Sequence, residues 1–121
     1  MYSIIEIASR NRLLAALLPS DLKLLLPSFT ATALEPKRIL ETPGEAIKYV
    51  YFVLSALMSV VGTTPPNHRI EVGMVGYEGM TGLSVVLADG TSANETIVQS
   101  AGSALRLPAG VLRTSMAESR A

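Results

Sequence analysis

The sequence predicts a mainly β domain, a double-stranded β-helix or jelly-roll with helices at both ends. Two observations carry this prediction. Two short apolar segments with helical spacing come first, and from residue 31 onward short extended stretches alternate with glycine and proline. Short strands at such regular spacing are typical of β-sandwiches and β-rolls.

The chain is expected to begin with short helices over residues 10–26. Asn11 has a side chain suited to an N-cap, and leucines at helical spacing follow it as far as Pro19. A second helical turn over 21–26 is expected to start at Ser20, because a serine hydroxyl can accept a hydrogen bond from an amide at a helix start.

Seven strands are expected between residues 31 and 107. Their ranges are 31–34, 38–41, 49–53, 56–61, 69–75, 95–100 and 104–107. Pro43 and Gly44 fit the central positions of a type II turn, since glycine there adopts a positive φ. A last helix is expected over 108–119, with Pro108 at its first position and one narrow, largely apolar face. All 121 residues then form one domain.

Composition excludes several classes of function. Ten basic and ten acidic residues cancel, so the chain lacks the positive charge that binding to nucleic acid requires. The longest mostly apolar run, residues 49–61, falls well short of the roughly 20 residues that cross a bilayer as a helix. The absence of cysteine fits a reducing compartment. We therefore expect a cytoplasmic domain that contacts neither membrane nor nucleic acid.

No constellation of catalytic residues is evident, and an enzyme is not expected. The sole histidine, His68, has no cysteine partners for a zinc site. Glu41 and Glu45 flank the Pro-Gly turn, where exposure to solvent is the normal state. Glycines recur at every third position from 73 to 82, but no Lys-Ser or Lys-Thr follows as in a nucleotide P-loop. We interpret these glycines as turn residues of the roll.

Four local strings resemble one branch of the Crp/Fnr-type bacterial transcription regulators. They are NRLLAAL at 11–17, PGEAIKYVYF at 43–52, VGMVGYEGMTGL at 72–83 and ALRLP at 104–108. The resemblance implies a cyclic-nucleotide-binding-like sensor domain without the family's DNA-binding domain, and a homodimer formed through the C-terminal helix. The chain departs from the family at Ala56, where the family has a glycine. If that turn needs a positive φ, Ala56 carries a strain of about 1 kcal/mol.

The resemblance also implies a position for an effector site. In family members that bind cyclic AMP, backbone amides at a helix start and an arginine hold the phosphate, while a glutamate binds the ribose. The corresponding candidate residues here are Gly82, Leu83, Ser84, Asn94, Glu95 and Thr96. Leu83 replaces the glutamate and Asn94 the arginine, and Glu95 could repel a phosphate. Tight binding of cyclic AMP is therefore not expected, and no cofactor or metal ion is assigned.

Two functions of different class remain open at this stage. The first is a regulatory sensor domain with an unknown small-molecule effector. The second is a stand-alone β-roll that acts as a protein-interaction or dimerisation module and has no small-molecule ligand. The apolar residues of the last helix, Leu112 and Met116, need a partner in either case.

Overall fold

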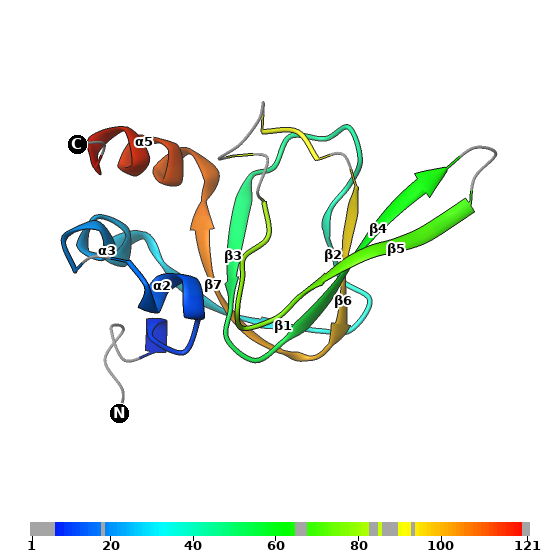
Figure 1. The fold of residues 1–121 in the computed structure, drawn as a ribbon, viewed down its shortest axis with the longest axis horizontal. Helices are drawn as coiled ribbons and strands as arrows, with labels where there is room; N and C mark the ends of the chain where they lie inside the picture. The colour runs from blue at the N-terminus through cyan, green and yellow to red at the C-terminus, as the bar shows by residue number, and fades with distance from the viewer. Residues whose placement is uncertain are drawn as a thin grey trace.

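The computed structural model describes residues 7–17, 19–64, 68–82, 85, 90–92 and 94–119. Short helices precede the strands: α2 (Arg12–Ala15), α3 (Pro19–Leu25) and the 3-10 helix η1 (Leu26–Ser28). The strands are β1 (Thr30–Leu34), β2 (Ile39–Glu41), β3 (Tyr49–Val53), β4 (Leu57–Thr64), β5 (His68–Val75), β6 (Glu95–Ser100) and β7 (Gly102–Pro108). Helix α5 (Ala109–Ser119) follows them (Figure 1).

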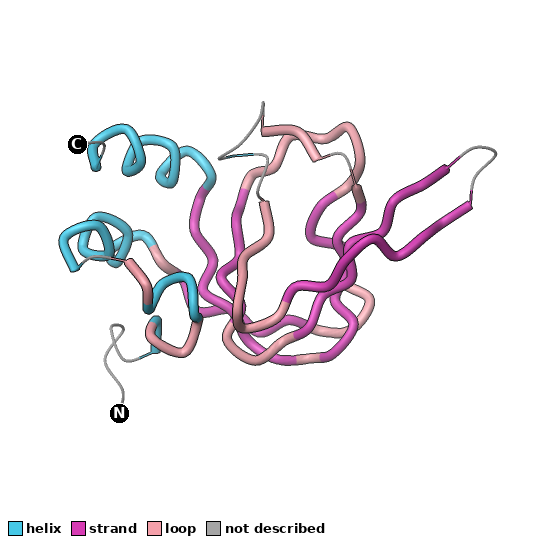
Figure 2. The backbone as a smooth tube through the Cα atoms, viewed as in Figure 1, coloured by secondary structure: helices cyan, strands magenta, loops and turns pink. Residues whose placement is uncertain are grey.

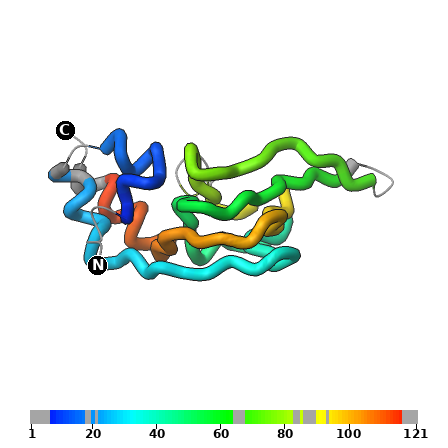
Figure 3. Tube along the Cα trace, turned by 90° about the horizontal axis from the view of Figure 1, so that it is seen from below, coloured from blue at the N-terminus to red at the C-terminus, as the bar shows by residue number. Residues whose placement is uncertain are grey.

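The strands form two antiparallel sheets, as the sequence predicts. One sheet has the order β1-β7-β3 and the other the order β2-β6-β4-β5. Figure 2 shows the helices gathered at one end of the molecule, with the β4–β5 hairpin extending away from them at the other end. Seen at right angles in Figure 3, the same separation of helices from strands is evident. None of the described helices is both long and apolar enough to cross a membrane.

Alternation along β3 and β7 divides the buried residues into two cores. Tyr51 and Val53 face the inside of the roll, where they pack with Ala104, Met58 and Val98. The alternate residues of β3 and β7 face the helices and form a second core. It contains the side chains of Val50, Phe52, Leu105, Leu107, Leu14, Leu25 and Leu112. Strands β3 and β7 thus form the wall between the roll and its helical end.

Asn11 fastens the N-terminal helices to this wall. Its side-chain oxygen accepts hydrogen bonds from the backbone amides of Leu13 and Leu14, which confirms the predicted N-cap. Its side-chain nitrogen donates to the carbonyl oxygens of Val53 (2.7 Å) and Gly79 (2.8 Å). Asn11 is fully buried, and this one side chain forms hydrogen bonds with four backbone groups.

The predicted first residues of two helices were wrong. Helix α3 begins at Pro19, so Ser20 lies inside the helix and is not its cap; proline suits the first helical turn because it lacks the amide that would be unpaired there. Pro108 is the last residue of β7, and α5 begins at Ala109.

The turn at Ala56 does not carry the strain expected there. Among the described residues, Lys37 is the only non-glycine residue with a positive φ. The close approach falls instead on the opposite strand, where a Cβ atom added to Gly102 would lie 2.5 Å from the backbone nitrogen of Ala56. In this strand pair glycine is therefore required at position 102.

The role of Asn11 predicts a large loss of stability on its removal. The substitution Asn11→Ala should lower the free energy of unfolding by about 2–4 kcal/mol, because it removes an N-cap and the two hydrogen bonds that join Asn11 to the carbonyl oxygens of Val53 and Gly79. Urea denaturation measures the change. The control is Gln99→Ala, which removes an exposed amide side chain from β6 and should change stability by no more than about 0.5 kcal/mol. Equal losses for the two variants would contradict the role of Asn11.

Candidate functional site

The segment between β5 and β6 carries the first candidate site residue and is held to the roll at both ends. At its start it runs beside β3: the backbone amide of Thr81 donates to the carbonyl of Tyr51 (3.0 Å), and the amide of Tyr51 donates to the Thr81 hydroxyl oxygen (3.1 Å). A β-bridge between Phe52 and Met80 extends this pairing. The segment is thereby placed as an additional strand on the free edge of β3.

The other end of the segment pairs with the Pro-Gly turn. The amide of Ser92 donates to the carbonyl of Glu45 (3.1 Å), and the amide of Gly44 donates to the carbonyl of Ser92 (2.8 Å). A third bond joins the amide of Ile47 to the carbonyl of Gly90 (2.8 Å). The turn that the sequence predicts at Pro43 and Gly44 therefore serves as the support for this end, and Gly44 has the expected positive φ of +82°.

Gly82 lies buried against β3 in a backbone conformation that favours glycine. Its φ is +79°, and an added Cβ atom would lie 2.6 Å from Cγ1 of Val50. Leu83 and Ser84, the next two candidate site residues, lie outside the described residues. Of the candidate turn, the structure thus describes the position and the conformation of Gly82.

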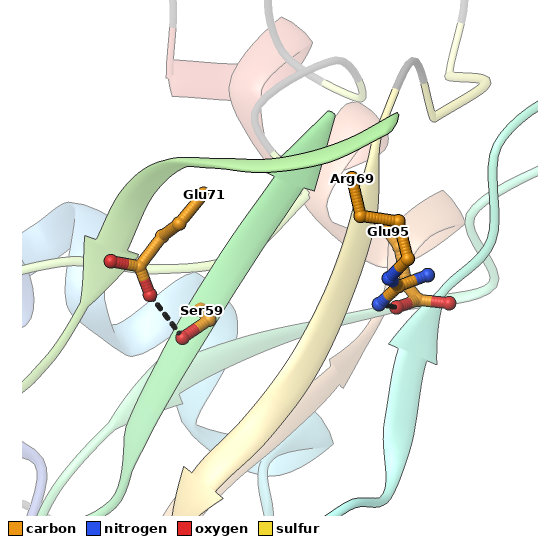
Figure 4. A network of polar contacts seen from close by, with 4 residues as sticks. All are labelled: Ser59, Arg69, Glu71 and Glu95. Atoms are coloured by element: carbon orange, nitrogen blue, oxygen red, sulfur yellow. Dashed lines mark hydrogen bonds and ion pairs between the residues drawn. The ribbon is translucent and has the colours of Figure 1, made fainter. Parts of the chain in front are cut away.

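The candidate residues at the start of β6 lie on different sides of the sheet. Thr96 is buried and shares the inner face of β6 with Val98, whereas Glu95 points to the outer face because neighbouring residues alternate along a strand. There the carboxylate of Glu95 forms an ion pair with Arg69 of β5, close to the hydrogen bond from Ser59 to Glu71 (Figure 4). Glu95 therefore does not supply the repulsive charge that the sequence suggested for the inside of the roll.

That charge comes from Glu41, which the sequence analysis placed in solvent. In β2, Ile39 pairs with Ile97 of β6, but Glu41 pairs with Thr96, because a bulge inserts Leu40 into the ladder. In a regular ladder Glu41 would lie opposite Glu95, on the outer face. The bulge reverses the face and turns Glu41 into the roll, so the expectation of an exposed Glu41 was wrong, while Glu45 is exposed as expected.

The surroundings of Glu41 are hydroxyl groups. Its Oε1 atom accepts hydrogen bonds from the hydroxyls of Ser92 and Thr96, each at 3.2 Å. Its Oε2 atom is buried and has no hydrogen-bond partner among the described residues. Burial raises the pKa of Glu41, and this effect outweighs the hydrogen bonds from Ser92, Thr96 and the backbone of Gly82, which lower it.

Gly82, Ser92 and Thr96 thus meet around one carboxylate, which comes from a distant part of the chain. Asn94 lies at their edge, where its backbone amide donates to the Ser92 hydroxyl (3.3 Å). No arginine or lysine forms an ion pair with Glu41 in the described part of the chain. The arrangement can accept hydrogen bonds and attract positive charge, and it opposes an anionic phosphate.

Other candidate chemistry receives no support from the geometry. His68 is the exposed first residue of β5, and Glu78 accepts a hydrogen bond from the amide of Gly76 within its own turn (3.1 Å). The described residues contain no group of three or more acidic or histidine side chains that could hold a metal ion.

An apolar hollow lies at the helical end of the molecule. Its volume is about 250 Å³, and its lining is almost entirely apolar: Leu13, Leu17, Leu24, Leu25, Phe52, Met80, Leu112, Ser115 and Met116. Helix α5 forms one side of this hollow and packs against α3. The sequence analysis identified Leu112 and Met116 as residues in need of a partner, and the structure places both here.

Comparison with known proteins finds similarity in fold. Neither the protein-family models nor the curated proteins contain a match to this chain. Solved structures match over nearly its whole length. A regulatory subunit of a cAMP-independent protein kinase A from Trypanosoma brucei, as a triple mutant bound to cAMP, has 15% identity and a TM-score of 0.77 over 96% of this chain. The chain spans 45% of the length of that protein.

Two further structures show the same similarity. The corresponding regulatory subunit from Trypanosoma cruzi, bound to guanosine, has 13% identity and a TM-score of 0.80, over 93% of this chain and 40% of its own. The sensor domain of the transcriptional regulator DNR from Pseudomonas aeruginosa has 13% identity and a TM-score of 0.74, over 93% and 76%. At these identities the matches show the fold, a cyclic-nucleotide-binding-like β-roll, and confirm the predicted fold class.

The close packing of Gly82 predicts that alanine at this position destabilises the fold more than alanine at other glycine positions. Gly82→Ala should cost at least about 2–3 kcal/mol of stability, because a positive φ and a contact with Val50 oppose the new methyl group. Gly44→Ala adds the φ strain alone and should cost about 1 kcal/mol. Gly73→Ala, with a free position for Cβ, should change stability by less than about 0.5 kcal/mol. Chemical denaturation of the three variants checks this order, and a mild effect at Gly82 would contradict the packing.

The raised pKa of Glu41 predicts that replacing it with a neutral residue increases the stability of the fold, and that this increase depends on pH. The native state binds this proton more tightly than the unfolded state, so its contribution to stability is present below about pH 4.5 and is lost as the pH rises through the folded-state pKa. Glu41→Gln should therefore raise the melting temperature at pH 7–8 by a few degrees, and the gain should shrink as the pH falls toward 4.5. A gain that is constant with pH would contradict the burial of charge.

Proposed function

We propose that this chain is the effector-sensing domain of a cytoplasmic bacterial transcription regulator of the Crp/Fnr type. In this proposal all 121 residues form one domain, and α5 carries the ligand state of the roll onward to a DNA-binding domain in the complete regulator. The similarity to the sensor domain of DNR supports the proposal, and so do the sequence strings that resemble Crp/Fnr regulators.

The observation that carries the proposal is the direct contact between the candidate site segment and α5. Val85 of the segment and Leu112 of α5 belong to the same buried core. At Gly90, an added Cβ atom would lie 1.9 Å from Nη2 of Arg113, so the Arg113 guanidinium of α5 lies directly against the backbone of the segment. A ligand that moves the segment must therefore also displace the packing of α5.

We further propose that the domain does not bind cyclic AMP tightly. A cyclic phosphate would meet Asn94 at the position of the family's arginine and the Glu41 carboxylate inside the roll. The regulatory subunits that resemble this chain in fold are described as bound to cAMP or to guanosine, and this supports a ligand of the nucleotide or nucleoside class. The effector itself is not identified by these observations.

A second function, a protein-interaction module without a ligand, is favoured by one surface. Strand β5 is an edge strand, and three apolar side chains on one of its faces, Ile70, Val72 and Met74, are about half exposed. Native mass spectrometry separates the two functions. A retained small molecule in a homodimer held through α5 favours sensing, whereas a stoichiometric protein partner in the absence of any small molecule favours the interaction module.

Hydrogen exchange of the α5 amides tests the sensing role. Saturation with guanosine or cyclic AMP, whichever binds, should slow exchange in α5 at least about threefold, because the segment and α5 share one core. Arg113→Ala should reduce that protection, and Arg38→Ala, which removes an exposed arginine far from α5 in sequence, should leave it unchanged. Binding with no change in the exchange of α5 would contradict the sensing role.

A further inference from the structure

Glu41 lies in a strand that can open locally. Strand β2 has three residues and stands at the edge of its sheet, where it pairs with β6. A bulge at Leu40 interrupts this short ladder between Ile39 and Glu41. Because an edge strand has a neighbour on one side only, its end can separate from the sheet without disturbing the other strands.

The hydrogen bonds around Glu41 suit a protonated carboxyl group better than a carboxylate. The hydroxyl oxygen of Ser92 lies 2.5 Å from the carbonyl oxygen of Asn94 and 3.2 Å from Oε1 of Glu41. A hydroxyl group has one hydrogen, and a carbonyl oxygen can only accept. If Glu41 is ionised, this one hydrogen must serve both acceptors. If Glu41 is protonated, its carboxyl group can donate to Ser92, and the Ser92 hydrogen then serves Asn94 alone.

The second oxygen of Glu41 has the same preference for the neutral state. Oε2 is buried and has no hydrogen-bond partner among the described residues. An unpaired buried oxygen costs more free energy when its carboxyl group is ionised than when it is neutral. This burial is the main cause of the raised pKa of Glu41.

Neighbouring charges do not replace the proton. The charged or titratable residues on the described elements around Glu41 are Arg38, Glu45, Lys48, Tyr49, Tyr51, Arg69, Glu71, Glu95 and Arg106. Glu95 lies on the outer face of the sheet and is paired with Arg69, and Arg106 lies 4.3 Å over the ring of Tyr49. None of these residues forms an ion pair with Glu41 in the part of the chain that the structure describes.

Ser92 connects Glu41 to the segment between β5 and β6. Its hydroxyl contacts the carboxyl group of Glu41, and its backbone pairs with the Pro-Gly turn through the carbonyl of Glu45 (3.1 Å) and the amide of Gly44 (2.8 Å). The same residue therefore contacts the acid and fastens this end of the segment to the roll.

We infer that the proton on Glu41 is a conformational switch. The protonated acid holds the end of β2, Ser92 and the Pro-Gly turn together, and the ionised acid opens this contact so that water reaches the carboxylate. The inference goes beyond the proposed function, because the proton acts on the segment in the absence of any other ligand.

Amide hydrogen exchange of the whole chain between pH 4.5 and about pH 8, expressed as protection factors, tests the inference. Protection of the Gly44 and Ser92 amides should fall at least about threefold as the pH rises through the titration of Glu41, because the closed contact retains the proton that the open form releases. The amide of Leu54, which follows β3 and donates to the carbonyl of Ser103, should keep its protection.

Two variants and one titration assign the effect to Glu41. Glu41→Gln keeps a neutral group at this position, so protection of Gly44 and Ser92 should stay constant over the same pH range. The matched control, Glu45→Gln, removes an exposed carboxylate from the same turn and should retain the pH dependence of the native chain. The carboxyl ¹³C resonance of Glu41 in the native chain should give a pKa above the ordinary value of 4.5.

Any of three results would overturn the inference: constant protection of Gly44 and Ser92 in the native chain, a pH dependence that persists in Glu41→Gln, or a pKa of Glu41 at or below 4.5. The first and third results come from the native chain alone, so they decide the question even if the variant does not fold. A ligand that binds without changing hydrogen exchange in α5 would remove the sensing role and leave this inference intact.

Discussion

The arrangement of the molecule depends on the backbone pairing that holds both ends of the segment between β5 and β6. Thr81 and Tyr51 exchange hydrogen bonds at one end, and Ser92 pairs with the Pro-Gly turn at the other. The segment, which we call the bridge, thus contacts the roll, where Gly82 lies against Val50, and α5, where Gly90 lies against Arg113. These two contacts are its inner and outer sides.

This bridge brings two different environments into contact. On the inner side, Ser92, Thr96 and the backbone of Gly82 surround the Glu41 carboxylate. On the outer side, Val85 and Gly90 contact the core and the arginine of α5. In the proposed function, a change in charge or hydrogen bonding at the inner side reaches α5 through these contacts.

Most of the fold could be predicted from the sequence, because its signals are local. Seven strands lie at or within three residues of their expected bounds, since turn residues and short β-branched runs mark strand ends directly. The N-cap at Asn11 was predicted for the same reason, but its two bonds to Val53 and Gly79 were not. Those bonds join residues more than 40 positions apart, and the sequence near Asn11 contains no pattern that predicts them.

The candidate site was less predictable, because one bulge determines its charge. The alternation of residues in 38–41 gives no sign that Leu40 is inserted into the ladder, and without the bulge Glu41 belongs on the outer face with Glu95. The sequence therefore placed an acidic group near the site but chose the wrong glutamate.

A carboxylate inside a roll of this fold changes what the roll can recognise without changing how it is built. The two cores, the Pro-Gly support and the bridge are made by apolar packing and backbone hydrogen bonds, and these are indifferent to the charge of a ligand. In the proposed function, the ligand is selected by the few polar side chains inside the roll. Replacing an acidic residue there by a basic one would reverse the ligand charge that the site prefers. In this proposal, the residues around Glu41 and Asn94 determine which small molecule the roll accepts.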